Sequence, residues 1–231
     1  MKWWLIAWRE IRWEVFLDRA SLFRTGIFVL IPIFFVFSTP RPANDATLVG
    51  LVLQSVFFPS LAGVSLIAAT FTAEKENGTL VPLLAAPIRD FDIVLGKLVG
   101  MVVPVMAACA LTLGAAYTLA GYRYGFGRVA HVLTPELLYA ILVLSLLYLI
   151  TTGSITMIVA ARIRSSRAAQ QVAGLVIAFS AVIFAGIGFL ATQVTEGWPL
   201  LVVGIALVAF DVAALDTARR LWQRGEVIAR V

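Results

Sequence analysis

Charged residues are scarce in this chain: Asp, Glu, Lys and Arg together make up 13% of its 231 residues. Ordinary soluble domains carry about 25% charged residues, so a soluble domain of this length would lack the polar surface that it needs. The 18 basic residues are scattered between long apolar runs, which argues against a nucleic-acid-binding module. The scarcity of charge, together with a hydrophobic content of 61%, predicts a membrane protein that binds no nucleic acid.

Cysteine and histidine each occur once, as Cys109 and His131. A single cysteine excludes an internal disulfide framework, and one histidine with one cysteine is too few for a typical metal cluster. The chain also lacks the Walker A pattern, so it cannot hydrolyse ATP by the P-loop route. We therefore expect no catalytic residue, no metal site and no cofactor in this chain. On this basis we predict that the chain is not an enzyme.

Six stretches lack Asp, Glu, Lys and Arg for about the length of a membrane crossing, which needs about 20 mostly apolar residues. They are residues 25–40, 46–73, 98–122, 137–161, 168–195 and 197–215, the last interrupted by Asp211. The runs are too long for the alternating strands of a membrane barrel, and helices satisfy their backbone polar groups within lipid. We therefore predict an all-α polytopic membrane protein with six transmembrane helices. Pro32, Pro59 and Pro104 fall inside predicted spans and are expected to kink them.

Lys and Arg are distributed unequally between the segments that join these helices. If the N-terminus is cytoplasmic, 15 of the 18 basic residues fall in cytoplasmic segments. The other three, Arg41, Arg123 and Arg128, fall outside. Because cytoplasmic loops collect Lys and Arg, we predict that both termini lie in the cytoplasm.

Residues 1–20 precede the first predicted span and are rich in tryptophan. Trp4, Trp8, Ile11 and Val15 form a narrow apolar seam at helical spacing. Tryptophan prefers the membrane–water interface, so we predict an interfacial helix on the cytoplasmic surface. The alternative is a frayed helical lead-in to the first span.

Residues 73–92 join the second and third predicted spans on the cytoplasmic side. Gly78 follows an asparagine, a pair that is typical of a turn, and Thr79 is placed to cap a helix. Pro87 is placed to end that helix, and Asp90 is expected to cap the next one. The segment is therefore predicted to hold a short cytoplasmic helix.

Leu80, Leu83 and Leu84 share one face of this predicted helix at spacings i, i+3 and i+4. A helix this short is not stable alone in water, so its apolar face must pack against something. Lipid is one candidate and a partner protein is another.

The string E-K-E-N-G-T-L-V-P-L-L-A-A-P-I over residues 74–88, followed by I-V-L-G-K over residues 93–97, resembles the central motif of type-2 ABC-transporter permeases. Residues 162–171 resemble the junction between the fourth and fifth spans of that family, and residues 221–228 are similar to its C-terminal tail. The six-span count with both ends inside extends the resemblance over the whole chain.

The resemblance implies the membrane subunit of an ATP-driven exporter, usually dimeric, which pairs with two cytoplasmic ATP-binding subunits that hold ATP and magnesium. The helix near residues 80–86 would be the coupling helix that sits in a groove of the ATPase. The partner-binding residues implied by the motif are Glu74, Glu76, Gly78, Thr79, Leu80, Leu83, Leu84 and Pro87. An apolar face flanked by charges suits such an interface, and the alternative is an ordinary interfacial loop helix.

On this view residues 1–231 form one transmembrane permease domain, with an interfacial helix at residues 1–20 and a coupling segment at residues 73–92. The expected location is the plasma (inner) membrane of a prokaryote, with a second copy of the chain, an ATPase subunit and the lipid bilayer as partners.

Asp211 is the one acid well inside a predicted span. Intramembrane carboxylates are costly and count as candidates for function. Three readings stay open: Asp211 lines a polar route, it bonds to Ser or Thr on another helix, or it sits nearer the interface than the hydropathy indicates.

Two other functions remain as alternatives. His131 is interpreted as a solvated residue of an outside loop, but it would serve as an axial haem ligand in a haem-exporter permease for cytochrome maturation. An ATP-independent secondary transporter is the second alternative, which inverted repeats would favour. A third class is a membrane scaffold that binds a partner without transport.

Overall fold

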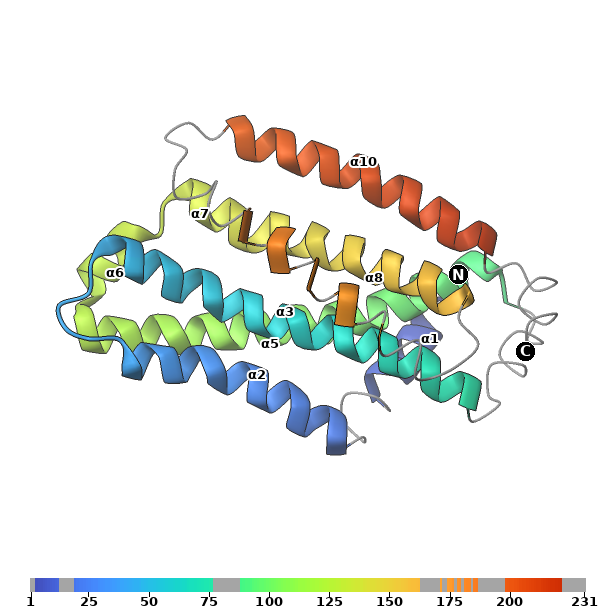
Figure 1. Ribbon diagram of the computed structural model, residues 1–231, viewed down its shortest axis with the longest axis horizontal. Coiled ribbons are helices and arrows are strands. Elements are labelled where there is room, and N and C mark those ends of the chain that lie inside the picture. Colours follow the sequence, from blue (N-terminus) through green and yellow to red (C-terminus); the bar gives the residue numbers. More distant parts are fainter. Residues whose placement is uncertain are drawn as a thin grey trace.

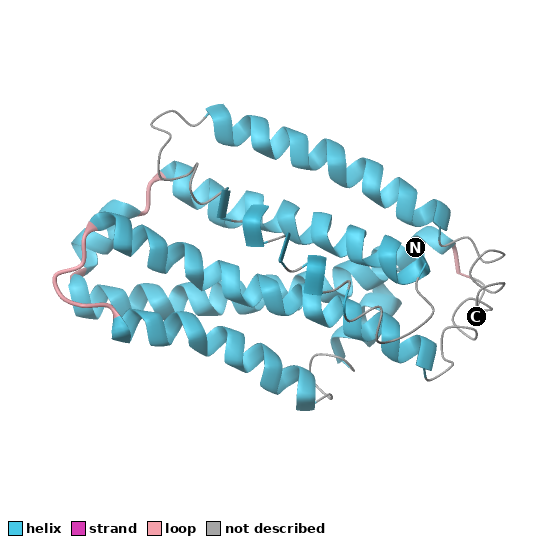
Figure 2. Cartoon of the chain, viewed as in Figure 1, coloured by secondary structure: helices cyan, strands magenta, loops and turns pink. Residues whose placement is uncertain are grey.

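The computed structural model describes residues 3–12, 19–76, 88–162, 171, 174–176, 178–179, 181–183, 185–186 and 198–221. Helices dominate this part of the chain, and none of its residues forms a strand (Figure 2). The all-helical class predicted from the apolar runs is confirmed for the described residues. The predicted helix at residues 80–86, most of the junction at residues 162–171 and most of the tail at residues 221–228 lie outside them.

Besides the π-helical residues 11–12 and the helical residues described between 171 and 186, the described chain forms the helices given in order at the end of this paragraph. Two short helices, α6 and α7, separate the two long helices α5 and α8. The elements are α1 (Trp3–Glu10), α2 (Arg19–Ser38), α3 (Asp45–Glu76), α5 (Asp90–Tyr124), α6 (Phe126–Val132), α7 (Pro135–Tyr139), η2 (Ala140–Leu144), α8 (Ser145–Arg162) and α10 (Trp198–Leu221).

The long helices lie side by side with their axes along the length of the molecule (Figure 1). Helix α3 packs against α5, α2 and α8, so it lies at the centre, and α10 lies at one edge against α8. The start of α3, α6 and the starts of α7 and α10 lie at one end of the bundle. The other end holds α1, the start of α5 and the ends of α3, α8 and α10 (Figure 1).

Four of the six predicted spans appear as helices that are long and apolar enough to cross a membrane. They are Asp45–Gly63, Phe91–Tyr124, Pro135–Val159 and Trp198–Ala218. The first predicted span corresponds to a shorter apolar helix, Thr25–Ser38, which α2 extends back to Arg19. For the fifth, the described residues 174–176, 178–179 and 181–183 are helical.

The fourth predicted span is not one uniform helix. Thr134 caps its start by accepting a hydrogen bond from the backbone N–H of Leu137, with Pro135 in the first turn, where a missing donor does no harm. The chain then widens into the π-helical turn η2 before α8 begins at Ser145. π-Helical turns are rare and occur often at functional sites, and the sequence carries no signal for one here.

The helix start expected at Asp90 differs by one residue. Arg89 has the extended backbone of the N-cap, with φ −70° and ψ 141°, and no side chain closes the cap. Asp90 is the first residue of α5 instead. The predicted capping role of Asp90 was therefore wrong, although the helix starts where expected. The three prolines lie inside α2, α3 and α5, as predicted.

Candidate functional site

The predicted coupling segment connects two helices that pack against each other. Helix α3 ends at Glu76 and α5 begins at Asp90, both at the same end of the bundle (Figure 1). Glu74 and Glu76 lie in the last turn of α3. The remaining partner-binding residues fall outside the described residues, and they are Gly78, Thr79, Leu80, Leu83, Leu84 and Pro87.

The short helix α1 packs against the start of α5. We call the contacts of Trp3, Ile6, Ala7 and Glu10 with Gly96, Lys97 and Gly100 the α1–α5 joint. Gly96 and Gly100, one turn apart, make the close approach possible. A Cβ atom at Gly96 would stand 2.7 Å from Ile6 Cβ and 2.7 Å from the carbonyl oxygen of Trp3. A Cβ atom at Gly100 would stand 2.8 Å from Glu10 Cβ. Since real Cβ atoms do not come so close to their neighbours, any larger residue at these two positions would have to push α1 and α5 apart.

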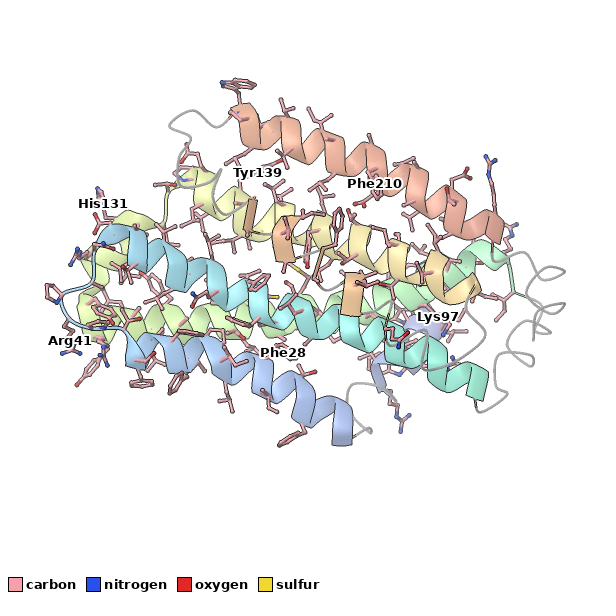
Figure 3. All side chains as sticks on the ribbon, viewed as in Figure 1. Phe28, Arg41, Lys97, His131, Tyr139 and Phe210 are labelled. Atoms are coloured by element: carbon pink, nitrogen blue, oxygen red, sulfur yellow. The ribbon has the colours of Figure 1, made fainter. Side chains whose placement is uncertain are left out.

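An ion pair is buried within the same joint. The ammonium group of Lys97 donates to Glu10 Oε1 at 3.3 Å, and the two side chains are 2% and 3% exposed. Arg9 also donates to Glu10 Oε1, at 2.7 Å, from the solvent side. Figure 3 labels Lys97 near the end of the bundle where Figure 1 shows α1. Removing or displacing one partner of an ion pair this deeply buried is strongly destabilising, because the other charge stays in a site with little solvent.

The outer face of α1 carries the aromatic side chains expected at a membrane interface. Trp4 and Trp8 stack with ring centroids 6.3 Å apart, and each is 54% exposed. The buried residues of α1 are Ile6, Ala7 and Glu10. The tryptophan part of the predicted seam therefore faces away from the protein, as an interfacial helix requires.

Asp211 lies inside α10 and is bonded to α8. The hydroxyl of Thr151 donates to Asp211 Oδ1 at 2.5 Å, and Asp211 is 5% exposed. Of the three readings given above, the bond to a threonine of another helix is the one that the structure shows. The second carboxylate oxygen, Oδ2, is buried without a hydrogen-bond partner among the described residues.

Thr151 also borders a small cavity of about 220 Å³. Thr152 and Ile155 of α8 form one wall of this cavity, and Leu175, Val176, Phe179 and Ile183 form the other. The hydroxyl of Thr152 bonds to the carbonyl oxygens of Tyr148 and Leu149 in its own helix. The cavity is therefore lined mainly by apolar groups, although it lies beside the Asp211–Thr151 pair.

At the other end of the bundle, polar side chains tie the helix ends together. Arg123 donates to the carbonyl oxygen of Thr39 at 2.8 Å, and Arg128 pairs with Asp45 at 3.0 Å. His131 is exposed in α6 (Figure 3). Among the residues that the structure describes, no group of three His, Cys, Asp or Glu side chains lies close enough to hold a metal ion.

Gly100 was expected from the sequence to permit close helix approach, but Gly96 and the Glu10–Lys97 pair were missed, although Gly96 and Lys97 belong to the motif at residues 93–97. The spacing of Gly96 and Gly100 by four residues is a known pattern of close helix approach in membranes, and it was available in the sequence. The pairing of Lys97 with Glu10 could not be read from the sequence, because the two residues are 87 positions apart and only packing brings them together.

The outward surfaces of the long helices are apolar. Helix α2 exposes Phe23, Ile27, Leu30, Phe34 and Phe37 along one face, and α10 exposes Leu201, Ile205 and Val208. Exposed apolar stripes of this length suit contact with lipid. The fold therefore defines a helical, multi-pass integral membrane protein.

The particular family follows from comparison with known proteins. A family model described as ABC-2 family transporter protein matches residues 23–205, which is most of the chain. The chain belongs to this family, as the resemblance of the motif at residues 74–97 predicted. No curated protein matches the chain closely enough to add to this assignment. Membership makes the chain a membrane component of a transporter and not an enzyme in its own right.

Proposed function

We propose that this chain is the transmembrane subunit of an ATP-driven exporter in a prokaryotic inner membrane. Two copies form the translocation pathway, and separate cytoplasmic subunits bind and hydrolyse ATP with magnesium. The segment at residues 73–92 receives the force of ATP-driven closure and passes it to the helices that it joins. The observation that carries this proposal is the family match, which includes the whole of that segment.

The ends of the coupling segment support this role. A push at this segment acts directly on α3 and α5, and α3 is the helix that contacts α2, α5 and α8. Two acidic residues of the motif, Glu74 and Glu76, fall in the last turn of α3 and would complement a basic surface on the partner. The neighbouring leucines provide the compact apolar anchor that such interfaces use.

The positions of the helix ends support six crossings with both termini in the cytoplasm. Helix α8 ends at the same end of the bundle as α1, whereas α10 starts at the opposite end (Figure 1). Arg162 and Trp198 therefore lie at opposite ends of the bundle, and the residues described between them, 174–176 and 181–183 among them, are helical. A fifth span there and α2 would add to the four long apolar helices to make six.

Co-purification with an ATP-binding subunit tests the proposal. The permease is expressed together with a candidate ABC ATPase subunit from the same organism, and the molar ratio of the two proteins after purification in detergent is measured. In the doubly substituted variant Leu83→Asp, Leu84→Asp, we expect the bound ATPase to fall at least tenfold, because two charges replace the apolar anchor. The matched control Leu83→Met, Leu84→Met keeps the apolar face and should bind normally.

Two results would contradict the proposal. One is an ATPase that never binds the unsubstituted chain, or binds the aspartate variant as well as the methionine control. The other is transport by the purified permease in vesicles that is driven by an ion gradient and needs no ATP, which is the behaviour of a secondary transporter.

A further inference from the structure

We infer that the α1–α5 joint holds α1 and α5 together as one rigid body throughout the transport cycle, and that Glu10 and Lys97 are positioning residues for the coupling segment. The role in coupling rests on the proposed function. The existence of the joint does not, because it is a property of this chain alone.

The first argument is the size of α1. The helix has eight residues, Trp3–Glu10, too few to be stable alone in water. Its buried side chains, Ile6, Ala7 and Glu10, lie where α5 presents Gly96 and Gly100. Packing against α5 is therefore what keeps α1 helical, and separation of the two would remove that support.

The second argument is the depth of the contact. Gly100 lets α5 approach the backbone of α1, since a Cβ atom there would stand 3.1 Å from the carbonyl oxygen and 3.3 Å from the Cα atom of Ala7. Close backbone approach at small residues is how helices associate firmly in membranes, where the hydrophobic effect does not drive them together. The contrast on the same helix is Gly114, which is exposed and has no atom within 4 Å of the place of its Cβ.

The third argument is the buried ion pair. Separating α1 from α5 would break the contact between Lys97 and Glu10, whose side chains are 2% and 3% exposed, although Glu10 would keep its contact with Arg9 of its own helix. Losing one partner of a shielded ion pair costs more free energy than losing one partner of an exposed pair. The pair therefore opposes any motion that opens the joint, and it also fixes how far α1 can slide along α5.

The position of the joint gives it a role in coupling. Lys97 lies seven residues, about two helical turns, after the start of α5 at Asp90, where the coupling segment ends. A force applied through that segment therefore acts on α5 about two helical turns from Lys97, where α5 contacts α1. Because α1 is fixed to α5, both move together, and the tryptophans on the outer face of α1 stay level with the membrane surface.

The joint is tested first by cross-linking in the background Cys109→Ser. The pairs Ile6→Cys with Gly96→Cys, and Glu10→Cys with Gly100→Cys, need a shift of about 1 Å to reach the Cβ–Cβ distance of a disulfide. We expect at least one pair to form a disulfide upon mild oxidation of the membrane-embedded permease. The matched control, Ile6→Cys with Gly114→Cys, should form none. If neither test pair reacts, or the control reacts as well, the joint does not exist.

The cycle is tested with the cross-linked complex. The ATP-binding subunit that co-purifies is assayed in proteoliposomes, and its rate of ATP hydrolysis is compared before and after oxidation. A joint that stays closed predicts rates equal within twofold. If oxidation lowers the rate fivefold or more and a reductant restores it, α1 must leave α5 during the cycle, and the inference is overturned.

Opening the joint tests its role as a positioning device. In Gly96→Leu we expect normal amounts of bound ATPase. The difference between the rates of ATP hydrolysis with and without the permease should be at least fivefold smaller than for the unsubstituted protein. Gly114→Leu, on the same helix, should behave as the unsubstituted protein. Lys97→Glu should show the same loss, and the exchange Glu10→Lys with Lys97→Glu should restore it. A full response in Gly96→Leu, or no rescue by the exchange, would contradict the positioning role.

The two failures can be told apart. If no ATPase binds the unsubstituted chain, the proposed function fails, while disulfide formation in the isolated permease still reports on the joint. If the ATPase binds and responds but no cross-link forms, the joint fails and the proposed function stands.

Discussion

Single buried polar groups are the residues at which this fold is most sensitive. Asp211 is the clearest case, because its carboxylate lies about 15 Å along α10 from the helix end at Leu221 and bonds to α8 through Thr151. Interhelical hydrogen bonds in membranes contribute about 0.6 kcal/mol on average and up to about 1.7 kcal/mol. Such a bond selects which faces of α8 and α10 meet, even though its energy is modest.

The bond between Thr151 and Asp211 can be tested by removing its donor. In Thr151→Val we expect a loss of about 0.5 to 2 kcal/mol in the free energy of unfolding, since the carboxylate loses its one bonded group among the described residues. The measurement is reversible unfolding in mixed micelles. Thr217→Val is the control, because Thr217 is exposed and bonds only to its own helix, at Ala213. Equal losses in both variants would show that the bond contributes nothing.

The charge of Asp211 is a separate question from its hydrogen bond. In Asp211→Asn the side-chain oxygen can still accept from Thr151, so we expect stability to change little. If the carboxylate lines a polar route for the substrate, ATP-driven transport should fall at least tenfold in this variant. Normal folding with full transport would leave Asp211 a purely structural residue.

Gly204 shows the same sensitivity through packing. A Cβ atom at this position of α10 would collide with the hydroxyl oxygen of Tyr139. Gly204→Ala should therefore destabilise the contact between α10 and α7 by about 1 to 3 kcal/mol. Adding Tyr139→Phe removes the colliding oxygen and should recover most of the loss in the same unfolding assay. If the second substitution brings no recovery, the strain arises elsewhere.

At the scale of the elements, the conformation at the end of one helix determines where the next helix lies. Helix α5 stops at Gly125, whose φ of 97° is the only positive value among the described residues. Its N–H closes the last turn of α5 by donating to Gly121. The chain then reverses into α6, which brings Phe126 against Gly121. This turn sets where α6 lies, and with it the ion pair of Arg128 with Asp45.

The turn at Gly125 predicts opposite effects of one substitution at two neighbouring glycines. Gly125→Ala places a side chain at a positive φ and should cost about 1 to 2 kcal/mol. Gly127→Ala lies in the helix α6 with open space around it, so it should raise stability by up to about 1 kcal/mol. Both are measured as shifts of the thermal unfolding midpoint in detergent. Equal shifts would mean that backbone conformation does not control this turn.

The whole molecule is an apolar bundle whose two ends differ in what they hold. One end has α1, the α1–α5 joint and the attachment points of the coupling segment, and the other has α6 with exposed His131 (Figures 1 and 3). This difference agrees with the bias of Lys and Arg toward one side, because the three residues assigned outside include Arg123 in the last turn of α5 and Arg128 in α6.

The orientation can be tested by labelling intact cells in the background Cys109→Ser. We expect a membrane-impermeant maleimide to label His131→Cys from outside. Arg220→Cys, near the end of α10 and at the opposite end of the bundle from His131, should react only after the cells are permeabilised. Both positions are exposed, so access through the membrane decides the result. The reverse pattern would place the termini outside and remove the coupling segment from the cytoplasm.

Much of this architecture could be predicted from the sequence, because lipid imposes strong rules on composition. The scarcity of charge predicted a membrane protein, and the gaps between charged residues located the four long apolar helices, although α5 starts at Asp90, eight residues before the predicted span at residue 98. The motif at residues 74–97 predicted the family. The π-helical turn η2 could not be predicted, because the sequence of the fourth span is apolar throughout and carries no local signal for a change of helix type.

The sequence by itself determined the class, the placement of the long apolar helices and the family, since each depends on local composition or on a contiguous motif. Only the tertiary structure decided which faces meet, including Glu10 with Lys97 and Thr151 with Asp211. The physical reason is that a helix in lipid is apolar on every side, so its periodicity does not mark the face that packs. Close contact at small residues and a few buried polar bonds make that choice, and both depend on residues far apart in the chain.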